Sequence, residues 1–211
     1  MGSGLSKDDI VAAALRVLGV RGIDGVTVRA VAAELGVQAA ALYYHVRNKQ
    51  ALLDEMGTTI QRRVVESLAG HTWSGSWLDD LSAYAWALRR EYLEHRDGAR
   101  TFSGTLITDP DVLRAQEPWL RRWLDAGVPA EVAFDGGELV TAFVVGFVIE
   151  EQERAQSATQ PARYGDAERD RRVGDEAPLV RAAGHARHDD EQRFGRQLSA
   201  VLIGLDASAR R

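Results

Sequence analysis

The residues with the clearest potential for binding chemistry lie between positions 24 and 50. Apolar side chains recur at helical spacing over residues 28–35, and Gly36 permits the left-handed backbone that ends a helix. A second short helix is expected over residues 39–45. Two helices joined by a short turn containing glycine form a helix-turn-helix, whose second helix enters the major groove of DNA. Gln38 opens that helix, where a side chain can reach base edges.

Catalytic chemistry has much weaker support. His185, His188 and Asp189 have a spacing on which a metal site could be imagined, but they fall in a charged turn between two predicted helices. Asp109 and Asp111 are typical of a helix start, where the helix dipole favours acidic residues. No nucleophile–base set or glycine-rich phosphate loop stands out, and cysteine is absent. We therefore expect no catalytic residue, metal site or cofactor; substrate turnover without DNA binding would favour an enzyme instead.

Length and composition limit the class of protein. The chain has 211 residues, of which 45% are hydrophobic, enough for a small domain and a larger one with a sizeable core. The longest apolar run, residues 139–149, is shorter than the roughly 20 residues that span a bilayer. The N-terminus lacks the pattern of a signal peptide. We expect a soluble, cytoplasmic protein that does not contact membranes.

The charge is divided unevenly along the chain. Residues 1–50 hold six basic and four acidic side chains, whereas the rest holds 20 basic and 27 acidic ones. A slightly positive N-terminal part on an acidic body is typical of a protein whose N-terminal part binds phosphate groups, because phosphates repel the acidic remainder.

Nearly every periodic segment has helical spacing, which predicts an all-α fold. Beyond the two short helices, we expect helices at residues 7–20, 48–68, 77–95, 97–105, 111–126, 129–154, 178–186 and 189–205. Pro118 should kink the 111–126 helix. Residues 155–177 are polar and without periodicity, so we expect a mobile loop or a disordered segment. A domain boundary is expected near residue 48.

Two C-terminal segments are too apolar for a solvated surface. Residues 139–149 are hydrophobic on nearly all sides, and the last helix has an apolar stripe. Both segments could lie deep in a monomeric body, or they could form a four-helix bundle across a two-fold axis. We favour a homodimer, because each chain has one reading helix and dimers read two half-sites.

Specific runs of sequence resemble a known family. TVRAVAAELGV followed by ALYYHVRNKQALL resembles the TetR family of one-component repressors. HRDGAR, GTLIT, VIEEQE and the final helix are similar to the tetracycline repressor subfamily. The resemblance implies an N-terminal three-helix helix-turn-helix domain (1–48) and a C-terminal helical domain for inducer binding and dimerisation (49–211). It also implies a repressor that binds a palindromic double-stranded operator and is released by a small molecule.

The resemblance assigns roles to residues of the DNA-binding segment. Arg29 matches an arginine that reads a base or grips phosphate; Tyr43 and Lys49 match phosphate clamps, and His45 lies near the phosphates. The complete expected set is Thr27, Val28, Arg29, Gln38, Ala39, Ala41, Tyr43, Tyr44, His45 and Lys49.

The reading helix departs from the subfamily. Ala39, Ala40 and Ala41 stand where tetracycline repressors have glutamine, proline and threonine. Methyl groups can touch a thymine methyl but make no bidentate hydrogen bonds. We expect a different operator, read through Arg29, Gln38 and DNA shape.

The inducer pocket departs further. The asparagine and two histidines that hold the drug and its magnesium ion in the subfamily fall on Tyr84, Val65 and Phe102. Another pocket histidine becomes Ala142, and a glutamine becomes Pro118. Phenylalanine offers no oxygen to a hard cation, so we do not expect sensing of magnesium–tetracycline.

An aromatic and apolar pocket is expected in its place. The candidate lining residues are Val65, Tyr84, Leu88, Phe102, Thr105, Leu106, Ile107, Gln116, Trp119, Trp123, Phe134, Ala142, Phe147 and Glu150. Such a pocket predicts a small, hydrophobic, flat aromatic or polyketide-like inducer. The alternative is a body that serves as a protein-interaction surface without an inducer. A solid body would favour that alternative, whereas a cavity would favour the sensor.

Overall fold

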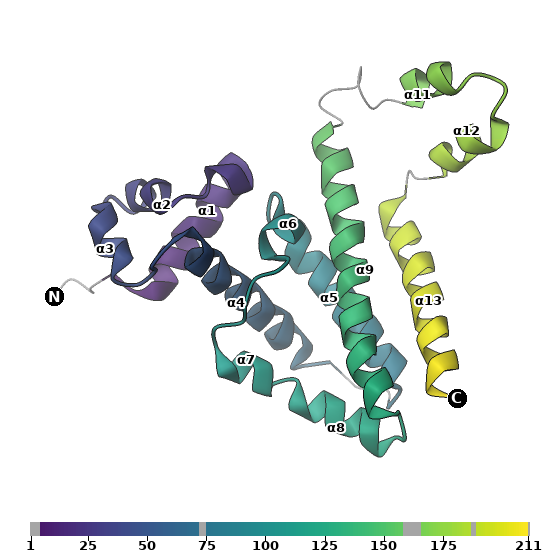
Figure 1. Ribbon diagram of the computed structural model, residues 1–211, viewed down its shortest axis with the longest axis horizontal. Coiled ribbons are helices and arrows are strands. Elements are labelled where there is room, and N and C mark those ends of the chain that lie inside the picture. Colours follow the sequence, from purple (N-terminus) through teal and green to yellow (C-terminus); the bar gives the residue numbers. More distant parts are fainter. Residues whose placement is uncertain (1–4, 72–74, 158–165, 187–188, 211) are drawn as a thin grey trace.

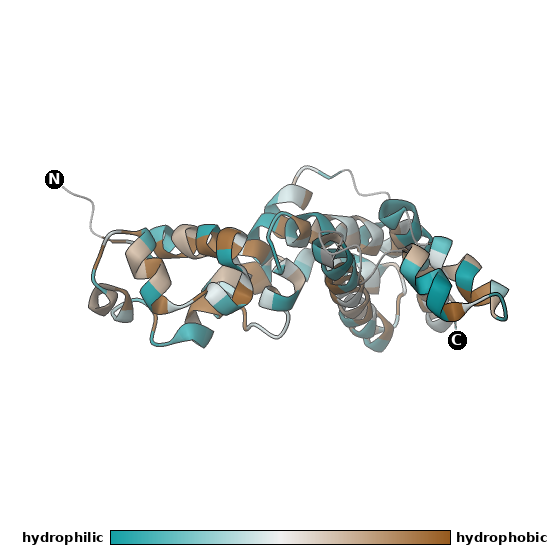
Figure 2. Ribbon diagram, turned by 90° about the horizontal axis from the view of Figure 1, so that it is seen from above, coloured by the Kyte–Doolittle hydropathy of each residue, from teal (hydrophilic) through white to brown (hydrophobic). Residues whose placement is uncertain are grey.

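The computed structural model describes residues 5–71, 75–157, 166–186 and 189–210. Within these ranges all regular structure is helical and no strand occurs, which confirms the predicted all-α fold (Figure 1). The N-terminal helices form a head at one end of an elongated molecule. The remaining helices form the body, and the view from above places head and body along the same long axis (Figure 2).

The head consists of α1 (Lys7–Gly25), α2 (Val28–Glu34) and α3 (Ala39–Tyr43). Ser6 begins α1 with a capping box, in which its side chain accepts from the Asp9 amide and the Asp9 carboxylate accepts from the Ser6 amide. The helix was expected to end at residue 20. It resumes after a kink at Gly22, whose φ of 69° is open to glycine at little cost.

The body is built on α4 (Lys49–Leu68), which runs out of the head and is capped by Asn48. Helices α5 (Trp77–Leu93) and α6 (Gly98–Phe102) pack against it, and the long α9 (Ala130–Ser157) lies along α5. The last helix, α13 (Asp190–Ala209), lies beside α9 and α5 (Figure 1). One continuous hydrophobic core joins head and body.

The expected helix over residues 111–126 is two helices, α7 (Pro110–Arg114) and α8 (Glu117–Asp125). Pro118 breaks this segment rather than kinking it. Proline has no amide hydrogen to donate to the residue 114 carbonyl, and its ring would clash with that carbonyl in a continuous helix. The chain turns through Ala115 and Gln116 and restarts with Pro118 in the first turn of α8.

The segment over residues 155–177 is more ordered than expected. Residues 155–157 continue α9, and α11 covers Asp166–Val173. Residues 158–165 lie outside the described residues. Helix α11 pairs with α12 (Pro178–His185) through the Arg169 guanidinium, which donates to the Arg181 carbonyl at 3.0 Å. The apolar periodicity that predicts a packed helix is missing because α11 is held mainly by polar contacts.

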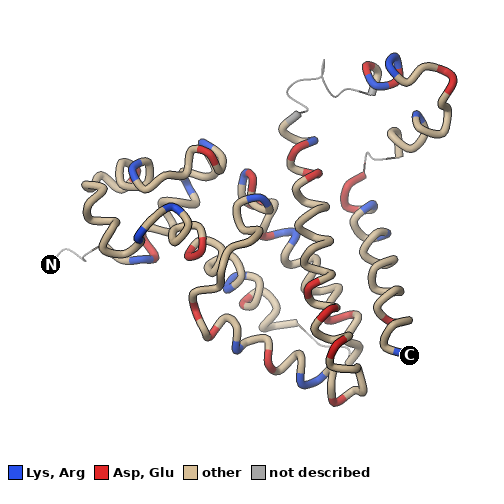
Figure 3. The backbone as a smooth tube through the Cα atoms, viewed as in Figure 1, with Lys and Arg blue, Asp and Glu red and all other residues tan. Residues whose placement is uncertain are grey.

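Helix α9 is also longer and more apolar than the sequence run suggested. Residues Ala130–Gln156 have the length and hydropathy of a membrane-spanning helix, although 33% of the most apolar window is buried in this molecule. Its charged residues lie toward the two ends, with none over residues 139–149 (Figure 3). The uncharged middle packs against α5 and α13, as the core helix of a protein body does.

Candidate functional site

The geometry of the head fixes α3 against α2. The Thr27 hydroxyl caps α2 by accepting from the Ala30 amide at 3.1 Å. Gly36 adopts a φ of 68°, and the Val37 amide donates back to the Ala32 carbonyl at 3.0 Å, so the chain reverses into α3. Leu42 is fully buried and anchors the inner face of α3. The opposite face of α3 is therefore presented to solvent.

Most of the expected DNA contacts lie on that outer surface. Tyr44 is 90% exposed and Tyr43 is 52% exposed, which is unusual for tyrosines without a ligand. Gln38 begins α3 through its backbone, and its amide makes no capping hydrogen bond. The other exposed members of the set are Thr27, Arg29, Ala41 and Lys49, with Ala39 and His45 half-buried.

Two of the residues expected to contact DNA are held by the head itself. Val28 is only 7% exposed, because its side chain faces the head core from the first turn of α2; its side chain cannot contact DNA. Lys49 is exposed, but its ammonium donates to the Ile23 carbonyl at 3.0 Å. To clamp a phosphate it must leave that carbonyl or share its remaining protons.

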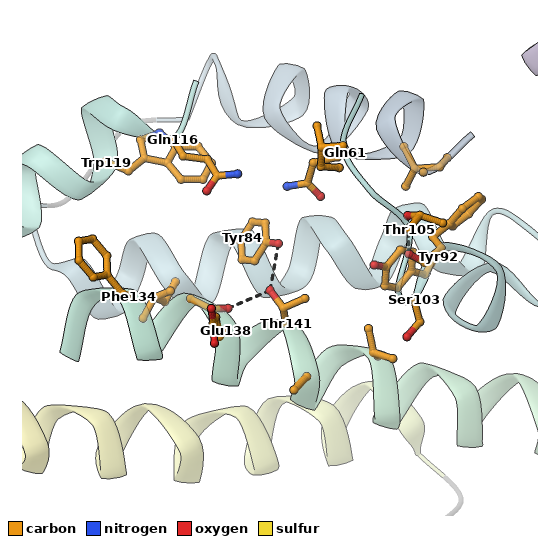
Figure 4. A pocket seen from close by; sticks show the side chains of 18 of the residues that line it. Gln61, Tyr84, Tyr92, Ser103, Thr105, Gln116, Trp119, Phe134, Glu138 and Thr141 are labelled. Carbon is orange, nitrogen blue, oxygen red and sulfur yellow. Dashed lines mark hydrogen bonds between the residues drawn. The ribbon is translucent and has the colours of Figure 1, made fainter. Parts of the chain in front are cut away.

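A cavity of about 880 Å³ lies in the body. Helices α4, α5, α8 and α9 and the loop after α6 supply its wall (Figure 4). The expected residues that line it are Tyr84, Phe102, Thr105, Ile107, Gln116, Trp119, Trp123, Phe134 and Ala142. This volume is within the usual range for drug-sized ligands.

Five expected lining residues do not reach the cavity. Leu88 and Phe147 are buried in the core, where Phe147 packs edge-on against Phe194. Val65 lies one turn of α4 beyond the last lining residue, and the Glu150 side chain is 69% exposed beside Arg154. Leu106 is 71% exposed, because its amide donates to Asp54 on α4 and its side chain faces solvent.

Sequence reasoning missed several polar lining residues, chiefly Gln61, Ser103, Glu138 and Thr141. The helical period could have found two of them. Phe134 and Ala142 were expected at the cavity, and Glu138 and Thr141 share their face of α9 at spacings of three and four residues. Gln61 precedes Val65 by one turn, so both lie on the same face of α4. The cavity ends at Gln61 and does not extend to Val65.

The polar side chains in the cavity are ordered by hydrogen bonds. The Tyr84 hydroxyl lies 3.2 Å from the Thr141 hydroxyl, which itself donates to the Gly137 carbonyl at 2.8 Å. Burial raises the pKa of Tyr84 above its usual value. Tyr84 is therefore a neutral phenol at physiological pH.

A hydrogen-bonded junction links the cavity region to the head. The Asp97 carboxylate, just before α6, accepts from the Ile23 amide at 3.1 Å and from the Gln156 amide at 2.7 Å. Nearby, Gln152 of α9 donates to the carbonyls of Tyr92 and His95. Since α6 ends in Phe102 at the cavity wall, this junction connects the α1 kink, α6 and α9.

The described members of the H-x-x-H-D pattern have separate partners. His185 contacts Asp170 at 2.8 Å, Asp189 caps α13, and His188 lies outside the described residues. Among the described residues, no group of three histidine, cysteine or acidic side chains could hold a metal ion. Phe102, at the position of a magnesium ligand in the resembling subfamily, is stacked on Tyr92 instead. These residues do not fit a magnesium site.

Comparison with known proteins supplies the family. A model for "Bacterial regulatory proteins, tetR family" matches residues 10–56, and a model for "Tetracyclin repressor-like, C-terminal domain" matches residues 69–209. The chain belongs to the TetR family. This TetR-family chain is 33% identical to the class E tetracycline repressor protein from Escherichia coli, covering 96% of this chain and 92% of the relative.

Solved TetR-family structures agree with this assignment. A possible TetR family transcriptional regulator from Streptomyces coelicolor A3(2) is 32% identical, with a TM-score of 0.81 over 96% of this chain and 100% of its own. ActR from Streptomyces coelicolor, solved in complex with (S)-DNPA, is 28% identical, with a TM-score of 0.77 over 99% and 100% of the two chains. The protein is thus a TetR-family transcriptional repressor with a DNA-binding head and a ligand-binding domain, in a family of soluble regulators rather than enzymes.

Proposed function

We propose that this TetR-family repressor acts in the cytoplasm as a homodimer on a palindromic operator. A small, hydrophobic, aromatic inducer other than magnesium–tetracycline releases it. The observation that carries the proposal is the cavity of about 880 Å³ with Tyr84, Trp119 and Phe134 in its wall. A body built only as a protein-interaction surface has no need of such a space, so the cavity favours the sensor over the alternative.

The choice against magnesium–tetracycline follows from the wall itself. Phe102 and Ala142 replace histidines of the tetracycline repressor subfamily and offer no donor or metal ligand. The related ActR was solved in complex with (S)-DNPA and also with actinorhodin, so a similar body has held two different ligands. We therefore assign this cavity to an aromatic ligand bound without a metal.

The inducer releases DNA through linkage between two conformations of the protein, one that prefers inducer and one that prefers operator. The loop that follows Phe102 contacts the cavity through Thr105 and Ile107, and it is bonded to α4 through the Thr108 amide, 2.8 Å from the Thr58 hydroxyl. A ligand that moves this loop moves α4, and α4 carries the head. If inducer prefers one head position and operator another, each must weaken the other by the same factor.

The dimer rests on exposed apolar side chains of α9 and α13. Leu139 on α9 is 50% exposed and Ile203 on α13 is 67% exposed. Small residues flank Ile203 on the outer face of its helix, Ala200 and Ala207 among them, so a second pair of helices could approach closely. Packing these faces across a two-fold axis buries them and supplies the second reading helix.

The deciding experiment combines operator selection with ligand screening. Selecting bound sequences from a random DNA pool should yield a palindrome, and aromatic compounds should then release the purified protein from it. Trp119→Ala should reduce sensitivity to the inducer while leaving operator affinity unchanged. Operator binding that no small molecule alters, with a partner protein altering it instead, would support the interaction-surface alternative.

A further inference from the structure

The charge in the cavity wall has one sign. Among the described residues that line it, Glu138 is the single charged side chain, and no lysine, arginine or histidine joins it. Glu138 lies on α9 beside Thr141, about one turn from Phe134 (Figure 4). Its carboxyl group forms an ion pair with none of the described basic side chains. The wall therefore offers a ligand one negative charge.

Three hydroxyl groups of the wall, those of Tyr84, Thr105 and Thr141, already take part in hydrogen bonds within the protein. The Thr141 hydroxyl donates to the Gly137 carbonyl, so Tyr84 must be the donor in its 3.2 Å contact with Thr141. The Thr105 hydroxyl likewise donates to the Phe102 carbonyl at 2.8 Å. Each of these hydroxyls then has only lone pairs to offer a ligand.

The other polar groups of the wall differ in the donors and acceptors that they offer a ligand. The Gln61 side chain also lines the cavity, and its amide group offers a ligand an acceptor oxygen as well as a donor. The Trp123 indole donates to Asp80 at 2.8 Å. Tyr92, Ser103 and Gln116, in other parts of the wall, retain donors. The central band of the wall, formed by Gln61, Tyr84, Glu138 and Thr141, thus offers acceptor oxygens and one acidic side chain.

We propose that the inducer is an arylalkyl amine, an aliphatic amine that carries an aromatic ring system, bound in its protonated form with Glu138 as its counter-ion. An ammonium group brings several donors and one positive charge, which complement the acceptors of the central band. Trp119 and Phe134 present aromatic faces that attract cations as well as flat apolar rings. This inference rests on the proposed sensor function and specifies the chemical class of its ligand.

The test uses three probes with the same ring system and different charge: aminomethyl-anthracene, hydroxymethyl-anthracene and anthracene carboxylate. Their affinities for the full-length protein are measured by fluorescence titration without DNA. We expect the cationic amine to bind about tenfold more tightly than the alcohol, and the carboxylate to bind most weakly. The preference of amine over alcohol should shrink as salt is added.

Glu138→Gln should weaken binding of the amine about five- to tenfold while changing the alcohol less than about twofold. Glu138→Asp keeps the charge and should retain the preference for the amine. Asp135→Asn removes an exposed carboxylate from the same helix outside the cavity wall and should change neither probe. Melting temperatures of all three variants confirm that they are folded.

Several outcomes overturn the proposal: equal binding of amine and alcohol, preference for the carboxylate, no binding of the amine, or an unchanged amine affinity in Glu138→Gln. The sensor function is judged separately by operator release. If the alcohol binds as well as the amine and both release operator DNA, the sensor stands and the cation preference fails. If the amine binds through Glu138 but operator binding is unchanged, the cation site stands and the sensor function fails.

Discussion

Arg29 is the side chain on which operator affinity should depend most directly. It is exposed in the first turn of α2. Replacing Arg29 with alanine should weaken operator binding and reduce the slope of log affinity against log salt by about one, because one fewer counterion is released. Affinity for the inducer should not change.

Titrations of operator at several salt concentrations check this prediction, with Arg114→Ala as a control. Arg114 is an exposed arginine of the body, so its loss changes net charge equally at a site away from the head. An unaltered salt slope in Arg29→Ala would remove Arg29 from the phosphate contacts. Lys49→Ala should also lower the slope, at the additional cost of its bond to the Ile23 carbonyl.

His95 should make stability depend on pH. Burial, together with the nearby Arg63, holds the pKa of His95 below its usual value of 6.5. The folded protein therefore favours the neutral ring, so the unfolded chain binds more protons as the pH falls through 6.5, and stability is lost. Above that pH the contribution of His95 is constant.

Urea unfolding between neutral and mildly acidic pH measures this dependence. His95→Gln removes the titrating group and should flatten the pH dependence in the range near and below 6.5. Because the His95 ring also packs edge-on against Phe102, the substitution should lower stability at every pH. A variant with the same slope as the original protein in that range would show that another group titrates there.

At the scale of elements, the junction at Asp97 connects α1, α6 and α9. Asp97 is 9% exposed and adopts a φ of 54°, uncommon for residues other than glycine. Asp97→Ala loses both hydrogen bonds and strains the backbone, which should reduce the free energy of unfolding by about 2–4 kcal/mol. It should also reduce the factor by which inducer weakens operator binding, because α6 then loses its bond to Ile23.

Asp97→Asn separates these effects. Asparagine tolerates the left-handed backbone and retains one acceptor, so it should cost less stability than alanine. Asp125→Ala, an exposed carboxylate in α8, serves as the control. Chemical denaturation measures stability, and operator titration with and without inducer measures coupling. If inducer weakens operator binding by the same factor in a folded Asp97→Ala protein as in the original protein, the connection between cavity and head lies elsewhere, such as in α4.

At the scale of the whole molecule, the apolar outer face of α13 should hold two copies together. Ile203→Asp places a charge in that face and should shift the protein from dimer to monomer while its helical content stays unchanged. Operator affinity should fall sharply, since a monomer reads one half-site. Gln197→Asp, on a different side of α13, is the matched control, and sedimentation measures the state of both. A dimeric Ile203→Asp protein would contradict this interface.

Periodicity determined most of the helices of this chain. The recurrence of buried side chains at three and four residues places α1 to α5, α9, α12 and α13 close to their expected positions, and caps such as Ser6 and Asn48 set their starts. The apolar periodicity did not predict the helices correctly where local chemistry outweighs amphipathicity. Pro118 divides α7 from α8, and α11 is held by charged pairs such as Arg172 with Glu168, which carry no apolar period.

The sequence by itself determined the all-helical class, the helix-turn-helix and the TetR-family resemblance, because turn residues and apolar spacing act locally. Only the tertiary structure decided which face of each helix meets the cavity. Tyr84 and Leu88 are one turn apart on α5, yet one lines the cavity and the other is core. Likewise, Thr141 contacts Tyr84, and Gln61 and Glu138 line the same cavity, because α4, α5 and α9 converge, and no local pattern encodes that convergence.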